Sequence, residues 1–310
     1  MKKHKICKIL LVILAIFLCV AFYELLGICV AYKKQPEVSN TTKKETKNGS
    51  WNECSENTER AVIIEKNPEA LLQRVRLIKN AKKEIILSTF AFQSDESGKL
   101  ILGALHDAAD RGVHIRLLVD GMESWIDMEG NPYFYGLSSH ENVEIKLYNK
   151  ANPLKPWKMM GRMHDKYLIA DGKRYILGGR NTYNYFLGDF PGHKNYDRDV
   201  LVVCDEPEKE NSVNQLLEYF ETIWEQEDSG YFHDNKKLAN RKSVKNAVLE
   251  LQNGYQKYFE ENKERICDTD YTDETFETEK IALVSNPIHT GPKEPVVWYQ
   301  LGELMKNAKE

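Results

Sequence analysis

Hydrophobic and polar positions divide the chain into a long apolar block followed by shorter segments of two kinds. Nearly every position from residue 9 to residue 32 is apolar. From residue 67 onward, stretches with apolar residues three or four positions apart, as in amphipathic helices, are separated by short bulky runs, as in buried strands. Strands alternating with helices predict an α/β fold, a mixed β-sheet flanked by helices.

The individual segments can be assigned by their period and their flanking residues. Helices are expected from Asn67-Pro68 onward, over 100–111 and over 212–224. A turn is expected at Asp171-Gly172-Lys173 between two of the strands. The strands are expected at 84–90, 113–119, 143–148, 166–170, 174–177 and 200–203.

The apolar block at residues 9–32 is long enough to cross a membrane, which takes about 20 residues. Glu24 is the exception within it. Four lysines in residues 1–8 predict a cytoplasmic N-terminus, a single-pass anchor in the cell membrane and a main domain on the extracytoplasmic side. A cleaved signal peptide is the alternative, although the run is long for one.

The segment after the anchor and the composition limit the other possibilities. Residues 33–58 are rich in Lys, Thr, Asn and Glu and are expected to form a flexible tether. No cysteine and histidine cluster has zinc spacing, so we expect no metal and no cofactor. A disulfide between Cys54 and Cys267 remains possible. The net charge of −4 argues against a nucleic-acid partner.

One motif carries most of the chemical information. His164, Lys166, Asp171, Gly178-Gly179 and Asn181 form the pattern H-x-K-x4-D-x6-G-G-x-N. Its first half lies on an expected strand, its aspartate on the turn and its glycines on the return strand. A histidine, a lysine, a carboxylate and a carboxamide at this spacing suit attack on a phosphodiester.

Each residue of the motif has a physical role in such a reaction. In an extended strand His164 and Lys166 share one face and Asp165 takes the other. A neutral imidazole is a good nucleophile near neutral pH, and a lysine cation can hold a phosphate oxygen. Asn181 adds neutral donors. The two glycines let the backbone approach a ligand, and Asp171 either orients a group or closes the turn.

This pattern resembles the HKD motif of the phospholipase D superfamily. The resemblance implies that His164 forms a phosphohistidine, that Lys166, Gly179 and Asn181 hold the substrate phosphate, and that Asp171 completes the catalytic set without a metal. Many members carry serine where this chain has Gly179. The resemblance also implies a second motif, whose histidine protonates the leaving alcohol, and this sequence shows only one.

Two neighbouring features have more than one interpretation. The carboxylates of Asp197 and Asp199 precede the last strand, where they either orient a catalytic group or form a solvated strand start. His193, in a loop with glycine and proline, can reach a substrate or lie on the surface.

A short repeat predicts the domain organisation. Residues 77–83 and 304–310 share Leu, Lys, Asn, Ala and Lys in order, each after an Asn-Pro pair. We therefore predict a first phospholipase D-like lobe at 59–230, a charged interlobe connector at 231–280 and the start of a truncated second lobe at 281–310. An ordinary helix ending is the alternative explanation of the repeat.

An N-terminal anchor followed by two lobes resembles bacterial cardiolipin synthases. This implies a membrane-anchored phosphatidyltransferase or phosphodiesterase with a phospholipid substrate, completed by a second HKD lobe or a second chain. A phosphodiesterase or nuclease completed by homodimerisation is one alternative. A non-catalytic half-enzyme that binds phospholipid is the other.

Overall fold

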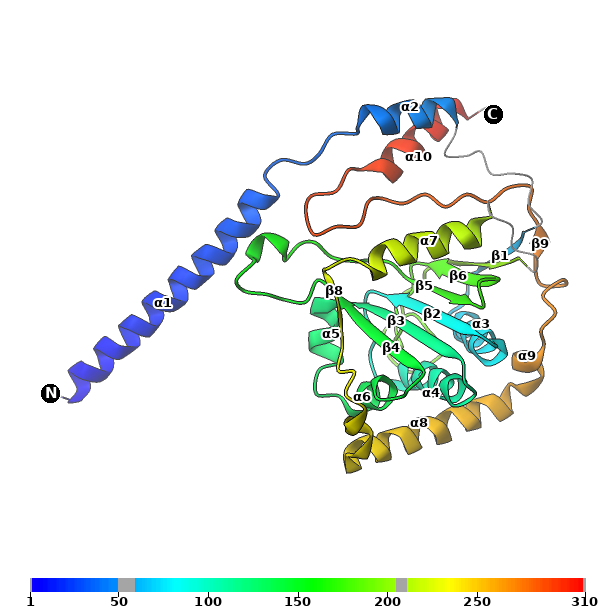
Figure 1. Ribbon diagram of the computed structural model, residues 1–310, viewed down its shortest axis with the longest axis horizontal. Coiled ribbons are helices and arrows are strands. Elements are labelled where there is room, and N and C mark those ends of the chain that lie inside the picture. The colour runs from blue at the N-terminus through cyan, green and yellow to red at the C-terminus, as the bar shows by residue number, and fades with distance from the viewer. Residues whose placement is uncertain (1, 50–58, 205–210, 309–310) are drawn as a thin grey trace. The chain divides into compact units, whose positions relative to one another are not determined.

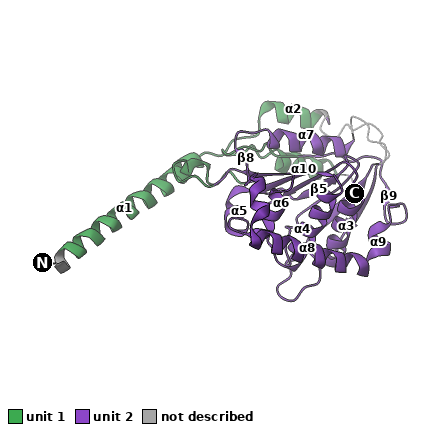
Figure 2. Cartoon of the chain, turned by 60° about the horizontal axis from the view of Figure 1, so that its bottom comes forward, with its two compact units in different colours: residues 1–48, 151–162, 285–310 green, residues 49–150, 163–284 purple. Residues whose placement is uncertain are grey.

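The computed structural model of this protein describes residues 2–49, 59–204 and 211–308. Its strands, which are rich in apolar residues, form one sheet. The chain divides into two compact units (Figure 2). The anchor unit comprises Met1–Asn48, Ala151–Arg162 and Ser285–Glu310, and the sheet unit comprises Gly49–Lys150 and Met163–Val284.

Within the described residues, the sheet unit has nine strands in the order β8-β4-β3-β2-β5-β6-β7-β1-β9. Strand β3 pairs in parallel with β2 and with β4, and the other pairs are antiparallel. The strands are β1 Arg60–Ile64, β2 Glu84–Thr89, β3 His114–Asp120, β4 Val143–Tyr148, β5 Tyr167–Ala170, β6 Arg174–Gly178, β7 Asp199–Val203, β8 Ser229–Tyr231 and β9 Phe276–Glu277.

Helices cover both faces of the sheet (Figure 1). Helix α7 (Ser212–Trp224) lies on one face, where Arg116 of β3 packs over the ring of Phe220. Alternate residues of β3, such as Leu117, belong to the apolar core on the other face. The helices on that side are α3 Asn67–Asn80, α4 Glu96–Asp110, α6 Pro132–Ser138, α8 Lys242–Glu261 and the short α9 Lys263–Cys267.

The register gathers several strand ends at one edge, which we call the motif edge. Tyr167 at the start of β5 pairs with Ser88 near the end of β2. Gly178 at the end of β6 pairs with Asp199 at the start of β7. Because β2, β3 and β4 run in the same direction, their carboxyl ends meet the start of β5 here. This is the edge at which open α/β sheets place ligands.

The predicted fold class, a mixed sheet flanked by helices, is confirmed, and the predicted strands all form. Helix α7 has the expected bounds, whereas α4 begins at Glu96, four residues before the expected start. Its N-cap, Asp95, accepts a hydrogen bond from the backbone N–H of Gly98. A capping side chain thus starts the helix before its apolar stripe is established.

The predicted connector at 231–280 is not a separate segment, because α8 packs against α4 and the sheet unit continues to Val284. Val244, Leu251 and Tyr255 of α8 are buried. The acidic end of the connector supplies β9, which pairs with β1. The charged solvent-facing side of α8 made this part of the chain look more exposed than it is.

The anchor unit contains α1 (Lys2–Ala31), in which Lys5–Ala31 is long and apolar enough to cross a membrane, with a mean hydropathy of 2.9. It also contains the 3-10 helix η2 (Pro156–Lys158) and α10 (Val296–Asn307).

The predicted flexible tether at 33–58 is wrong in part, because α2 forms at Asn40–Asn48. The side chain of Ser39 accepts a hydrogen bond from the backbone N–H of Thr42 and starts this helix. Residues 50–58 of the tether lie outside the described residues, as does Cys54 and therefore its possible disulfide with Cys267.

Candidate active site

His164 and Lys166 lie immediately before β5, at the motif edge. Their side chains share a face as the strand period requires, and the Lys166 Nζ donates a hydrogen bond to the His164 carbonyl oxygen at 2.7 Å. Asp165 points the other way, where its carboxylate accepts a 2.8 Å hydrogen bond from the Tyr219 hydroxyl on α7. The pair that suits phosphate chemistry is therefore presented on one side of the sheet.

The His164 side chain is exposed and rests on an aromatic neighbour. Its ring centroid lies 4.6 Å from that of Phe90, the residue that follows β2, at an interplanar angle of 59°. Although the side chain is exposed, the surrounding atoms remove part of the water around the ring, and this partial desolvation together with the Lys166 cation lowers the pKa of His164 below its ordinary value. The imidazole is therefore neutral at neutral pH, the form that a nucleophile needs.

Lys166 is buried, with 6% of its surface exposed. Burial lowers the pKa of its ammonium group to about 8, and the carboxylates of Asp165 and Asp197 oppose this shift. Its Nζ also lies 5.4 Å from the Phe90 ring centroid. A lysine held in this way is a poorly hydrated cation beside the histidine, well placed to attract a phosphate oxygen.

A buried carboxylate that the sequence analysis did not single out fixes the approach to His164. Asp120, at the end of β3, is fully buried and its Oδ2 accepts the backbone N–H of Met163 at 3.1 Å. Its Oδ1 accepts the N–H of Met122 at 3.0 Å and caps α5 (Gly121–Asp127). Its position in the sequence, as an aspartate at the carboxyl end of a buried strand, is the signal that could have identified Asp120.

Asn181 contacts the backbone of Ala91, the residue after Phe90. Its Oδ1 accepts the backbone N–H of Ala91 at 3.2 Å, and its side chain is buried. Burial raises the pKa of the neighbouring Tyr183, although a hydrogen bond with Asn181 opposes the change. The segment Phe90-Ala91 thus brings His164, Lys166 and Asn181 together. Phe90 itself was missed, because its role depends on the pairing of β2 with β5.

The two glycines of the motif make room for carboxylates. A Cβ at Gly178 would lie 2.0 Å from Asp199 Oδ1, and one at Gly179 would lie 2.0 Å from Asp197 Oδ2. The expectation that Gly179 lets a ligand approach therefore needs correction. The space left by its missing side chain is filled by Asp197.

Asp199 is buried rather than solvated. Its Oδ2 accepts a hydrogen bond from Arg74 Nη1 at 2.9 Å and lies 3.2 Å from Arg180 Nη1. Arg180, also buried, donates to the backbone carbonyls of Ile64 and Glu65. This network holds the ends of β1 and β6 and the start of β7 together, so the solvated-strand interpretation is wrong for Asp199.

Asp171 lies at the far end of β5 from His164, in a left-handed backbone conformation with φ of 55°. Its carboxylate accepts the backbone N–H groups of Lys82, Lys83 and Glu84 at 2.7–3.1 Å. Of the two roles left open by the sequence, these contacts match closure of the turn. The expectation that Asp171 is catalytic is corrected accordingly. Its carboxylate is engaged by three backbone amides at the end of β5 that lies away from His164.

Replacing Asp171 by alanine is therefore expected to lower stability, by about 2 kcal/mol, because three backbone N–H donors lose a charged acceptor. Asp171→Asn, which keeps one acceptor oxygen and tolerates the left-handed conformation, is expected to lose less. Urea unfolding of the solubilised chain measures both. A variant that keeps its stability but loses turnover would restore a catalytic role.

His193 remains at the surface. Its Nε2 lies 2.8 Å from Asn195 Oδ1, and its ring centroid is 5.1 Å from that of Tyr185. Its side chain is exposed.

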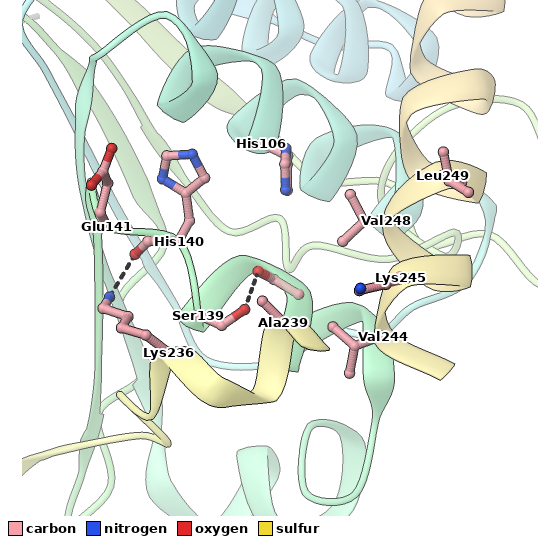
Figure 3. A pocket seen from close by; sticks show the side chains of 11 residues that line it. His106, Ser139, His140, Glu141, Lys236, Ala239, Val244, Lys245, Val248 and Leu249 are labelled. Atoms are coloured by element: carbon pink, nitrogen blue, oxygen red, sulfur yellow. Dashed lines mark hydrogen bonds between the residues drawn. The ribbon is translucent and has the colours of Figure 1, made fainter. Parts of the chain in front are cut away.

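A hollow of about 710 Å³ lies between α4, α6, α8 and the 3-10 helix η3 (Lys236–Asn240), and none of the motif residues lines it (Figure 3). His106 and His140 lie on one side, both within 3.2 Å of the Asp110 carboxylate, and Val244 and Val248 lie on the other. Over the described ranges, no three His, Cys, Asp or Glu residues are grouped so as to hold a metal ion.

The fold and the motif edge agree with the match to a known family. Residues 74–224 match the family model described as "Cardiolipin synthase, PLD-like domain", and this stretch contains the whole motif. This match identifies a phospholipase D-like domain in the chain.

Curated relatives of the chain include cardiolipin synthases. It is 29% identical to cardiolipin synthase C of Escherichia coli over 171 residues, 51% of this chain and 34% of that protein. It is 34% identical to cardiolipin synthase 1 of Staphylococcus aureus over 117 residues, 37% of this chain and 23% of that protein. An uncharacterised Helicobacter pylori protein is 30% identical over 64% of this chain and 39% of its own length. The chain thus spans less than half of each of these proteins.

Solved structures resemble the chain more loosely. NucT from Helicobacter pylori is 17% identical, with a TM-score of 0.44 over 56% of this chain and 99% of that chain. Phosphatidylserine synthase from Haemophilus influenzae is 16% identical, with a TM-score of 0.46 over 79% of this chain and 52% of that chain. These likenesses are too distant to bear on function.

Proposed function

We propose that the protein is a membrane-anchored phosphatidyltransferase or phosphodiesterase of the phospholipase D type, similar to cardiolipin synthase, acting through a phosphohistidine at His164. One observation carries the proposal. An exposed, neutral imidazole stands beside a buried lysine at the sheet edge, within the stretch that matches the family.

The proposed reaction has two displacements at phosphorus. A ring nitrogen of His164 forms a bond to phosphorus, and the bond from phosphorus to the leaving alcohol breaks. A general acid outside this motif gives that alcohol its proton. The same group then takes the proton of an acceptor alcohol or water, whose oxygen bonds to phosphorus as the bond from phosphorus to His164 breaks. Lys166 and Asn181 stabilise the charge on the non-bridging oxygens, most strongly in the transition states.

The general acid is proposed to be the histidine of a second HKD lobe or of a second chain. The repeat supports this view, because α10 is the counterpart of α3. Leu77 and Ile78 of α3 are buried, whereas the matching Leu304 and Met305 of α10 are exposed. Both helices end at an alanine C-cap in extended conformation. We propose accordingly that 281–310 opens a second lobe.

A phospholipid is the proposed substrate because apolar and aromatic side chains are exposed at the motif edge. Trp125 and Ile126, on the helix after β3, are 68% and 67% exposed, and Tyr196, which precedes β7, is 86% exposed. Such residues are favoured where water meets lipid. We place the N-terminal lysines in the cytoplasm and the sheet unit on the opposite side, anchored through α1.

Carboxylates near Asn181 argue against a nucleic-acid substrate. Burial, together with the charges of Glu123 and Asp95, raises the pKa of Asp127. The charges of Glu123 and Asp127 also help to raise the pKa of Tyr183, which is hydrogen-bonded to Asn181. A polyanion would have to bring many phosphates past these groups, whereas a lipid brings one.

Trapping the covalent intermediate tests the proposal. Proteoliposomes holding the protein and acyl-labelled phosphatidylglycerol are quenched in alkaline detergent, which preserves a phosphorus–nitrogen bond. We expect a phosphatidyl adduct on the peptide that contains His164, together with glycerol release. Glycerol release without an adduct would contradict the phosphohistidine. An adduct formed only with an oligonucleotide would overturn the lipid assignment in favour of a nuclease.

A further inference from the structure

The loop at residues 151–162, which ends two residues before His164 in the sequence, is packed against the membrane helix. A Cβ at Gly27 of α1 would lie 2.4 Å from Pro156 Cγ, so the helix and the loop are in direct contact there. One turn earlier on the helix, the Tyr23 hydroxyl donates a hydrogen bond to the Leu154 carbonyl oxygen at 3.1 Å. Both helix residues lie inside the candidate span Lys5–Ala31.

The contact points set the depth of the loop. A bilayer core about 30 Å thick takes about 20 helical residues. Counted from Ile9, the first residue after the basic end, about 20 residues reach Ile28. Tyr23 and Gly27 therefore fall within the last turns of the hydrocarbon-spanning stretch, and a loop attached to them lies at the boundary between acyl chains and headgroups.

The loop has the side chains that such a boundary favours. Leu154, Trp157 and Met160 are 75%, 46% and 56% exposed, although they are large and apolar. Lys155, between the first two, is exposed as well. Apolar residues and a tryptophan beside a lysine match the interface, where acyl chains meet phosphate headgroups.

The same face of α1 carries its acidic residue. Glu24 lies one turn before Gly27, and both of its carboxylate oxygens are covered without a hydrogen-bond partner among the described residues. A carboxylate facing acyl chains would be costly. The helix thus presents its least lipid-compatible face toward the loop, and this favours keeping the loop beside the helix in a bilayer.

We infer that residues 151–162 form a second membrane contact, in which Leu154, Trp157 and Met160 enter the outer headgroup region of the bilayer beside α1. This inference rests on the proposed anchoring through α1 and extends it. A bilayer contact so close in sequence to His164 would hold the nucleophile near the level of lipid phosphates.

Photo-crosslinking tests the inference in the full chain reconstituted into phosphatidylglycerol vesicles. The photoreactive residue p-benzoylphenylalanine is placed at Leu154, at Leu18 within α1, or at Leu249 on α8. Leu249 is the matched control, because it is 57% exposed but belongs to the sheet unit. Illumination followed by mass spectrometry is expected to give phospholipid adducts at 154 and 18 and at least tenfold less at 249.

The three sites separate the possible failures. An adduct at 18 with no more at 154 than at 249 would overturn the loop contact and leave the anchor intact. No adduct at 18 would show that α1 is not embedded, and the proposed anchoring would fail with the inference. Equal adducts at 154 and 249 would show unspecific contact with lipid and would also overturn it.

Discussion

Alanine at position 164 is expected to lower kcat/KM for release of the lipid headgroup alcohol by roughly three orders of magnitude or more. The imidazole is the group that would bond to phosphorus, and alanine leaves no nitrogen in its place. Phe90, whose ring centroid lies 4.6 Å from that of the histidine, offers no nucleophile. Headgroup release from vesicles measures the loss, and the trapped adduct should disappear with it.

His193→Ala is the matched control for this experiment. His193 is also an exposed histidine, it follows the last residue of the motif by twelve positions, and its hydrogen-bonded partner is Asn195. Its replacement is expected to leave turnover near that of the unchanged protein. Equal losses in the two variants, or a His164→Ala variant within tenfold of normal activity, would contradict the nucleophile assignment. The latter result would support a non-catalytic, phospholipid-binding half-enzyme instead.

The arrangement of His164, Asp165 and Lys166 was predictable because it depends only on local geometry. In an extended segment alternate side chains take opposite faces, whatever the rest of the fold does. The sequence thus predicted that His164 and Lys166 act together and that Asp165 does not. The strand, turn and strand around Asp171 followed in the same way from bulky residues on either side of Asp171-Gly172.

The parts that were missed depend on contacts between distant segments. Phe90 meets His164 only because β2 pairs with β5, and Asp120 reaches Met163 only because β3 lies beside β2. A sequence pattern carries no register between such strands. The reason for Gly179 was likewise inaccessible, since it depends on Asp197 approaching from the start of β7.

Lys166→Met is expected to lower activity and raise stability at the same time. Turnover should fall by roughly 10²–10³-fold, because the methyl thioether cannot hold a phosphate oxygen as charge develops. The free energy of unfolding at pH 7 should rise by about 1–3 kcal/mol, since the buried ammonium is costly to keep charged. The upper end of this range corresponds to the whole pKa shift of Lys166. Loss of the hydrogen bond from Lys166 to the His164 carbonyl reduces the gain in stability.

The pH dependence identifies the cause of this gain. The pKa of Lys166 is about 8 in the folded protein and near its ordinary value of 10.5 in the unfolded chain. Between these values the unfolded chain binds more protons, so the contribution of Lys166 to stability rises with pH. The penalty is complete below about pH 8 and gone above about pH 10.5. The advantage of Lys166→Met should therefore be largest at pH 7 and vanish at high pH.

Lys146→Met provides the matched comparison. Lys146 is another buried lysine with a hydrogen bond to a backbone carbonyl, that of Trp224 at 2.9 Å. Its ammonium group also lies 4.5 Å from the Trp224 ring centroid and 5.1 Å from that of Tyr231, and because these two rings stabilise the buried cation, its loss is expected to destabilise the fold. Urea unfolding of the detergent-solubilised variants across this pH range measures both effects. If Lys166→Met were less stable at pH 7, burial of the cation would not be costly. In the unchanged protein the KM for lipid should also rise above about pH 8, because neutral Lys166 no longer attracts the phosphate.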